Sequence, residues 1–146
     1  MAEVAVGLGK YIVDGGLSLR FSPRHPASAL QTSELELALR DTQTRMYALD
    51  MSAVDDFRVD DGFNIARRRV QDIAESGALK YMVSTYDARD NILRDTDFGL
   101  GRKVVTFNNI LKHDVFPLAM ALDFMLSTGQ REMCRPVEIE FAGTIN

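Results

Sequence analysis

At 146 residues, 46% of them apolar, the chain has the size of one ordinary globular domain with a single hydrophobic core. Its formal net charge of -4 argues against a nucleic-acid-binding protein, because neutralising phosphates requires a basic surface. The single cysteine, Cys134, excludes a disulfide within these residues and a cysteine-based zinc cluster. The lone cysteine fits a reducing cytoplasm, and no apolar run approaches the roughly 20 residues of a membrane span, so we expect a soluble, cytoplasmic protein with no membrane contact.

Two short strands are predicted before the first prolines. The apolar residues 4–6 end at Gly7-Leu8-Gly9, which predicts a strand leading into a glycine turn. Alternation then predicts a strand over residues 17–21, with Leu17, Leu19 and Phe21 on one face.

A short helix and a third strand are predicted next. Ser33 and Glu36 have the capping-box spacing, in which each side chain bonds the other residue's backbone amide, and a helix to about Arg40 is expected to follow. The alternating residues 42–51 favour a strand that is buried at its end.

Residues 63–74 carry the clearest helical spacing in the chain. Their apolar members recur at helical intervals before Gly77 and are Phe63, Ala66, Val70, Ile73 and Ala74. The remaining side carries Arg67, Arg68 and Arg69. Such a run is usually a solvated helix side, with phosphate or partner binding as the alternative.

The second half predicts a hairpin, another strand and a helix. Residues 80–86 and 92–94 favour two strands joined by a polar turn, and residues 104–107 favour a further strand. Pro117 is expected to start a helix that Gly129 ends. The following methionines are expected to fill gaps in the core: Met82, Met120, Met125 and Met133. Mixed strands and helices without a composition break predict one α+β domain with a largely antiparallel sheet and packed helices.

The segment 136–142 carries the main candidate for metal chemistry. In a strand, Val137, Ile139 and Phe141 would share one face, while Glu138 and Glu140 would share the other. Carboxylates roughly 6–7 Å apart along a strand suit a hard cation such as magnesium, which commonly bridges carboxylates to nucleotide phosphates. The alternative is an exposed strand whose glutamates are only solvated.

The glycine segment does not match the standard phosphate loops. Residues 7–15 lack the Gly-Lys-Ser/Thr of a Walker loop, and Ile12 stands where a dinucleotide fingerprint needs a third glycine. Glycines in such a segment more often form turns than bind phosphate.

Taken together, three segments resemble the ATP-grasp domain shared by phosphoenolpyruvate synthases and pyruvate phosphate dikinases: residues 7–15, 104–111 and 136–142. The resemblance implies that Glu140 is the carboxylate that holds the magnesium of ATP and that Glu138 is a supporting ligand or acceptor. Gly7 and Gly9 resemble the family's Gly-Leu-Gly-acidic turn. Lys10 stands where the acidic residue is usual, so it is expected to meet phosphate instead.

The resemblance also implies a parent protein that uses ATP and Mg²⁺ to phosphorylate a carrier histidine serving pyruvate–phosphoenolpyruvate interconversion. Residues 1–146 would then be a single partial domain, the C-terminal part of the ATP-grasp domain. The family's second metal ligand, its phosphohistidine domain and its phosphoenolpyruvate/pyruvate domain lie outside these residues. The isolated chain is therefore expected to be catalytically inactive, with the remaining parent domains as its partners.

Two alternatives stay open. The first is a non-catalytic nucleotide-binding or interaction module of ATP-grasp descent. The second is another ATP-grasp enzyme, such as a carboxylate ligase, which the sequence Glu138-Ile139-Glu140-Phe141 disfavours.

Overall fold

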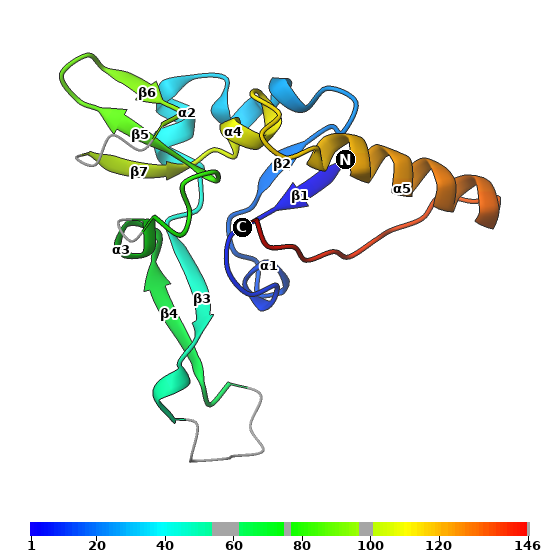
Figure 1. Cartoon of the computed structure of the whole chain (residues 1–146), viewed down its shortest axis with the longest axis horizontal. Helices are drawn as coiled ribbons and strands as arrows, with labels where there is room; N and C mark the ends of the chain where they lie inside the picture. The colour runs from blue at the N-terminus through cyan, green and yellow to red at the C-terminus, as the bar shows by residue number, and fades with distance from the viewer. Residues whose placement is uncertain (54–61, 75–76, 97–100, 146) are drawn as a thin grey trace.

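The computed structural model describes residues 1–53, 62–74, 77–96 and 101–145. This part of the chain is an α+β fold in which short helices accompany three small antiparallel sheets (Figure 1). The predicted fold class and antiparallel pairing are confirmed. The described strands form three separate sheets instead of one.

The first sheet pairs β1 (Ala2–Val4) with β2 (Leu19–Phe21). Leu19 and Phe21 are buried on one face, as alternation predicts, but Leu17 precedes the strand and is 47% exposed. Between the strands, the glycine turn leads into α1 (Lys10–Val13).

Two 3-10 turns, η1 (Pro26–Ser28) and η2 (Leu30–Thr32), precede α2 (Leu35–Arg40). The helix α2 ends at Arg40, as predicted, but the predicted capping box between Ser33 and Glu36 is not formed. Glu34 is the N-cap residue and gives no side-chain cap, while the Ser33 hydroxyl donates to the Leu30 carbonyl at 2.8 Å. The preceding turn therefore provides the acceptor for the serine that was expected to cap the helix.

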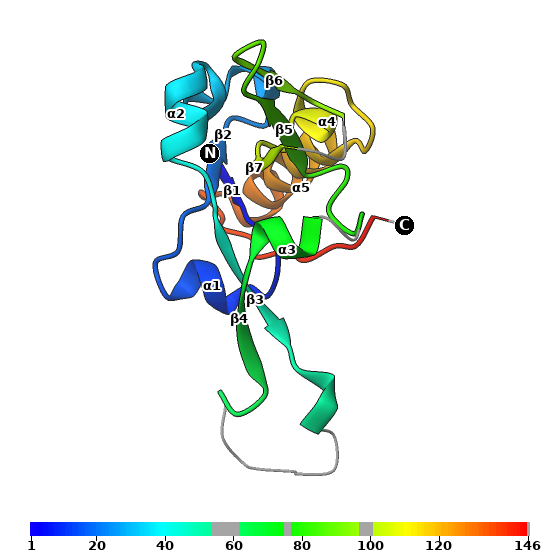
Figure 2. The same cartoon turned by 90° about the vertical axis from the view of Figure 1, so that its left-hand side faces the viewer.

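The second sheet is a hairpin of β3 (Arg45–Leu49) and β4 (Ile65–Arg69), which projects from the body in both views (Figures 1 and 2). The turn η3 (Met51–Ala53) follows β3. The predicted helix over 63–74 is wrong in its first half, because α3 begins only at Val70 (Val70–Ala74). Pairing with β3 supplies backbone hydrogen bonds to every second residue from 64 to 70, so tertiary contacts override the helical spacing.

The third sheet has β5 (Val83–Asp87) at its centre, flanked by β6 (Ile92–Arg94) and β7 (Arg102–Val105). The predicted hairpin and the strand after Gly101 are confirmed. All three strands run antiparallel to their neighbours, which matches the short turn between β5 and β6.

Two helices complete the fold, α4 (Asn108–Leu111) and α5 (Leu118–Met133). Pro117 precedes α5 as predicted, but Gly129 does not end the helix. The helix continues to Met133, and its C-cap residue, Cys134, has a left-handed backbone conformation. Only one turn of α5 is deeply anchored, at buried Leu122.

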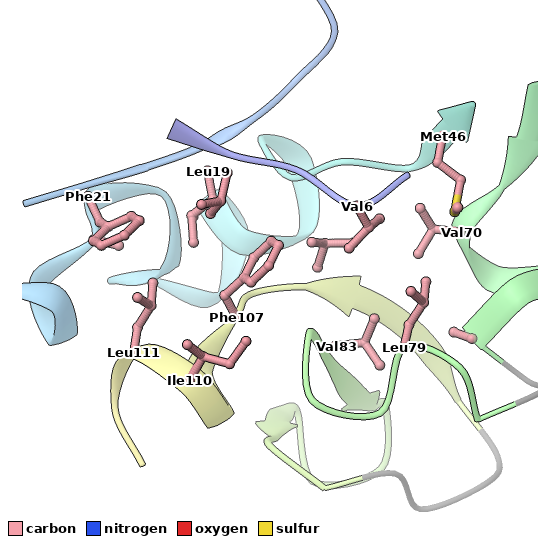
Figure 3. Close-up of a cluster of buried hydrophobic side chains, with 14 of the residues drawn as sticks. Val6, Leu19, Phe21, Met46, Val70, Leu79, Val83, Phe107, Ile110 and Leu111 are labelled. Carbon is pink, nitrogen blue, oxygen red and sulfur yellow. The ribbon is translucent and has the colours of Figure 1, made fainter. Parts of the chain in front are cut away.

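The core takes residues from all three sheets and from α3, α4 and α5 (Figure 3). Leu19, Phe21 and Leu111 gather at one end of the cluster in this view, while Val70 and Leu79 lie at the other. The predicted role of the methionines is wrong for three of them: Met120, Met125 and Met133 are exposed on α5, and only Met82 packs against the core.

Candidate functional site

The acidic residues lie on the C-terminal segment (residues 136–145), which runs back beneath α5 as an extended chain (Figure 1). The predicted strand over 136–142 is not formed, because no described strand pairs with it. The segment is held at its two ends. Val137 packs against Gly129 of α5, and Ile145 packs against the core.

The apolar side chains of this segment do not form a buried face. Ile139 and Phe141 are 40% and 42% exposed, and Glu138 and Glu140 are exposed as well. Neither carboxylate has a described hydrogen-bond or ion-pair partner within residues 1–53, 62–74, 77–96 and 101–145. Their oxygens are therefore open to a cation.

The donor set fits magnesium in the type and the number of its protein carboxylates. Magnesium takes one or two protein carboxylates and completes its shell with water and phosphate oxygens. Glu138 and Glu140 supply two such donors. Within the described part of the chain, no group of three or more His, Cys, Asp or Glu side chains is placed to hold a metal ion.

Arginines surround the start of the C-terminal segment. A shallow groove of about 570 Å³ is lined by Arg24, Arg131, Arg135 and Cys134 and reaches Pro136. Arg24 bonds Asp123 at 3.2 Å, and Arg131 bonds Glu132 at 3.0 Å. Because exposed ion pairs of this kind contribute little, these guanidinium groups can exchange partners with an anion.

The glycine turn has a structural explanation. Gly7 has φ +92°, and a Cβ there would lie 2.6 Å from the Tyr47 carbonyl oxygen, which accepts a hydrogen bond from Leu8 N at 3.0 Å. Glycine at position 7 thus lets the turn dock on the edge of β3. Gly9 has ordinary helical dihedrals with open space around it, and Lys10 pairs with Asp14 on the surface of α1 at 3.1 Å.

The structure does not bring the glycine turn and the acidic pair together. Tyr11 of α1 stacks edge-on against Tyr47, with ring centroids 5.7 Å apart, so α1 belongs to the base of the hairpin. No described hydrogen bond or ion pair connects Gly7, Gly9 or Lys10 with the C-terminal segment. No described hydrogen bond or ion pair therefore joins these three residues to the two glutamates.

Sequence reasoning missed a polar cluster around Asp95. Its carboxylate accepts from Ser84 at 2.8 Å, from Asn108 at 2.8 Å and from the His113 ring at 3.0 Å. Burial raises the pKa of Asp95, but the three hydrogen bonds together lower it by more. The pKa of Asp95 therefore lies below its usual value. The sequence signal that could have indicated this cluster is the adjacent pair Asn108-Asn109, which follows an apolar strand. The cluster connects β5 with α4 through Asp95, so it stabilises the fold.

Comparison with protein-family models, with curated proteins and with solved structures finds no match. Among the residues that the structure describes, no helix is both long enough and apolar enough to cross a bilayer.

Proposed function

We propose that this chain is an ATP-grasp-like part of a cytoplasmic, ATP- and Mg²⁺-dependent phosphotransferase of the phosphoenolpyruvate synthase or pyruvate phosphate dikinase type. The parent would phosphorylate a carrier histidine that serves pyruvate–phosphoenolpyruvate interconversion. One observation carries the proposal: Glu138 and Glu140 alternate along an exposed, extended segment, and neither has a described partner. The chain contributes the acidic wall of the nucleotide site.

The chemistry of the neighbouring groove supports this assignment. Magnesium bound between carboxylates and phosphates neutralises charge on the nucleotide, and guanidinium groups bind phosphate oxygens in a fork. Arg135 and Pro136, which both line the groove, lie three and two positions before Glu138. Carboxylates for the metal and guanidinium groups for phosphate are thus close in sequence and share one end of α5.

The proposal rests on the acidic pair and not on the glycine turn. Lys10 reaches phosphate only if its exposed pair with Asp14 opens, and Gly7 is already required by its contact with Tyr47. The remaining phosphate contacts, the phosphohistidine domain and the pyruvate site are assigned to other parts of the parent polypeptide.

Equilibrium binding of a fluorescent ATP analogue with Mg²⁺ tests the proposal on this chain. Binding is expected to be weak, with a Kd of about 1 mM, to need Mg²⁺ and to be lost in Glu140→Gln. Glu36→Gln is the matched control, because it removes the same charge from exposed α2. Binding that survives Glu140→Gln, or that does not need Mg²⁺, would contradict the proposal.

A second candidate is an interaction module without catalysis. It is favoured by the outer face of α5, where Met120 and Phe124 are 70% and 69% exposed. Exposed apolar side chains of this size gathered on one helix are typical of a surface that contacts another protein or domain. If this candidate is correct, Met120→Ser/Phe124→Ser abolishes association with the parent's other domains, and Glu140→Gln leaves it unchanged.

A further inference from the structure

A second groove runs along the first half of α5 and meets the arginine-lined groove only at Ser127, which lines both. Its volume of about 540 Å³ lies within the range of roughly 300–1,000 Å³ that is usual for ligand-binding pockets. Most of its lining is apolar. The helix α4 contributes the buried residues Ile110 and Leu111, and α5 contributes Met120 and Phe124.

The groove is open to solvent along α5. Met120 and Phe124 are 70% and 69% exposed although they line it. A pocket for a small molecule buries roughly 70–90% of its ligand, which an open groove of this kind does not do. An amphipathic helix, in contrast, lays one apolar stripe into a groove and leaves its other side in water. The shape therefore suits a helical segment of a protein partner.

The charged groups of this groove are acidic. Asp114 and Asp123 line it, and no lysine, arginine or histidine is among the described residues that do so. The Asp114 carboxylate has no partner within residues 1–53, 62–74, 77–96 and 101–145. Asp123 bonds Arg24 at 3.2 Å, and both side chains of this pair are well exposed. Because exposed pairs contribute little, a competing cation can displace Arg24.

Charge complementarity selects the occupant of the groove. An acidic helix or an anionic lipid surface would bring like charges against Asp114 and Asp123. A second copy that docked through the same groove around a two-fold axis would place these carboxylates against their own counterparts, and each copy carries a net charge of -4. A helix with lysine or arginine beside its apolar stripe brings opposite charges to both carboxylates.

We propose that this groove binds a basic amphipathic helix in one of the parent's other domains. An aromatic or long aliphatic side chain of that helix packs against Phe124 and the buried residues of α4, while flanking lysine or arginine side chains pair with Asp114 and Asp123. The inference rests on the second candidate function, to which it adds the chemistry of the partner. It needs neither Glu138 nor Glu140, so nucleotide and metal are not required.

Fluorescence anisotropy with a labelled helical peptide of leucine and lysine tests the inference on this chain, in EDTA and without nucleotide. The peptide has about five helical turns (~18 residues) with leucine on one face. We expect a Kd of about 10 μM, which rises when the salt is raised from about 50 mM to about 500 mM. The same peptide with glutamate in place of every lysine is expected not to bind.

Two variants separate the apolar and the charged contacts. Phe124→Ser is expected to raise the Kd for the leucine–lysine peptide at least about tenfold. Asp114→Asn/Asp123→Asn is expected to raise it about fivefold. The matched control is Asp14→Asn/Asp90→Asn, which removes the same charge from two exposed sites in α1 and the β5–β6 turn and should leave the Kd unchanged.

Arg24→Gln gives a test in the opposite direction. Because it frees the Asp123 carboxylate, it is expected to lower the Kd for the leucine–lysine peptide at least about twofold. Weaker binding to this variant would overturn the proposal.

The remaining outcomes also decide the partner's chemistry. Equal binding of the two peptides, or equal effects of Asp114→Asn/Asp123→Asn and its control, would overturn the basic partner and leave an interaction surface without charge selection. Binding that survives Phe124→Ser would overturn the groove itself. Sedimentation velocity of the chain alone covers the last occupant, since a dimer abolished by Phe124→Ser would assign the groove to a second copy. None of these results bears on nucleotide binding, which Glu140→Gln tests separately.

Discussion

A Cβ atom on Gly129 would lie 3.0 Å from a methyl carbon of Val137. This close approach holds the start of the acidic segment against α5, and it explains why a glycine occurs inside the helix instead of ending it. The position of Glu138, one residue later, therefore depends on the absence of a side chain at residue 129.

Gly129→Ala tests how firmly that segment is held. Replacing glycine by alanine inside an exposed helix stabilises it by about 1 kcal/mol. Since the segment beyond Val137 is unpaired, we expect Val137 to move aside and the chain to gain up to ~1 kcal/mol in urea unfolding. In a Val137→Ala background, which removes the contact, the full gain is expected. Destabilisation in the first background but not in the second would show that the segment is rigid.

Gly7→Ala should destabilise the fold, because position 7 has φ +92° and a Cβ there would meet the Tyr47 carbonyl oxygen at 2.6 Å. Strain of this kind costs about 1–3 kcal/mol, before the loss of the Leu8–Tyr47 hydrogen bond. Gly9→Ala is the control, since its dihedrals are helical and no atom lies within 4 Å of the added carbon. Equal unfolding free energies for the two variants would refute the structural role of Gly7.

Asp95 predicts a specific pH dependence of stability. Its pKa in the folded state lies below the ordinary value of 3.8, so its contribution is present above the unfolded-state pKa and is lost as the pH falls through the folded-state pKa. Asp95→Asn should reduce the loss of unfolding free energy between pH 5 and the acid limit.

At pH 7 the same variant should cost about 1–3 kcal/mol, because partners such as fully buried Ser84 lose a charged acceptor. His113→Ala, at an exposed ring, should cost less than ~1 kcal/mol. Urea unfolding across this pH range measures both effects. If the unfolding free energy of Asp95→Asn fell with decreasing pH as steeply as that of the wild type, the stabilising role of the Asp95 carboxylate would be contradicted.

In the proposed parent enzyme, Glu140→Gln should lower ATP-dependent phosphoenolpyruvate formation, because the substitution removes an anionic magnesium ligand but keeps its shape. We also expect residues 1–146 alone to form no phosphoenolpyruvate from ATP and pyruvate. Full activity in the parent variant, or robust turnover by the isolated chain, would contradict the assignment.

Much of the fold follows from local sequence signals. Alternation and turn residues are sufficient for the β5–β6 hairpin, for β7 and for β3, because each is decided within a few residues. The expected burial at the end of β3 is wrong, since Leu49 is 50% exposed. Residues 65–69 are different. Ala66 and Val70 fit a helical period, yet residues 65–69 form a strand because they pair with β3, which lies earlier in the chain.

The candidate site was less predictable for a related reason. Alternation at Glu138 and Glu140 identifies a strand-like segment, but a strand also needs a neighbour, and none of the described strands supplies one. The Asp95 cluster depends on residues from β5, α4 and the stretch after β6, and no local pattern brings these together.

Paramagnetic broadening by Mn²⁺-ATP, followed in amide NMR spectra of the isolated chain, tests the central claim most directly. If Glu138 and Glu140 form one wall of a metal–nucleotide site, broadening should centre on residues 137–141, extend to Arg135, and disappear in Glu138→Gln/Glu140→Gln. Broadening centred on Gly7, Gly9 and Lys10, or a pattern unchanged by the double substitution, would contradict the claim.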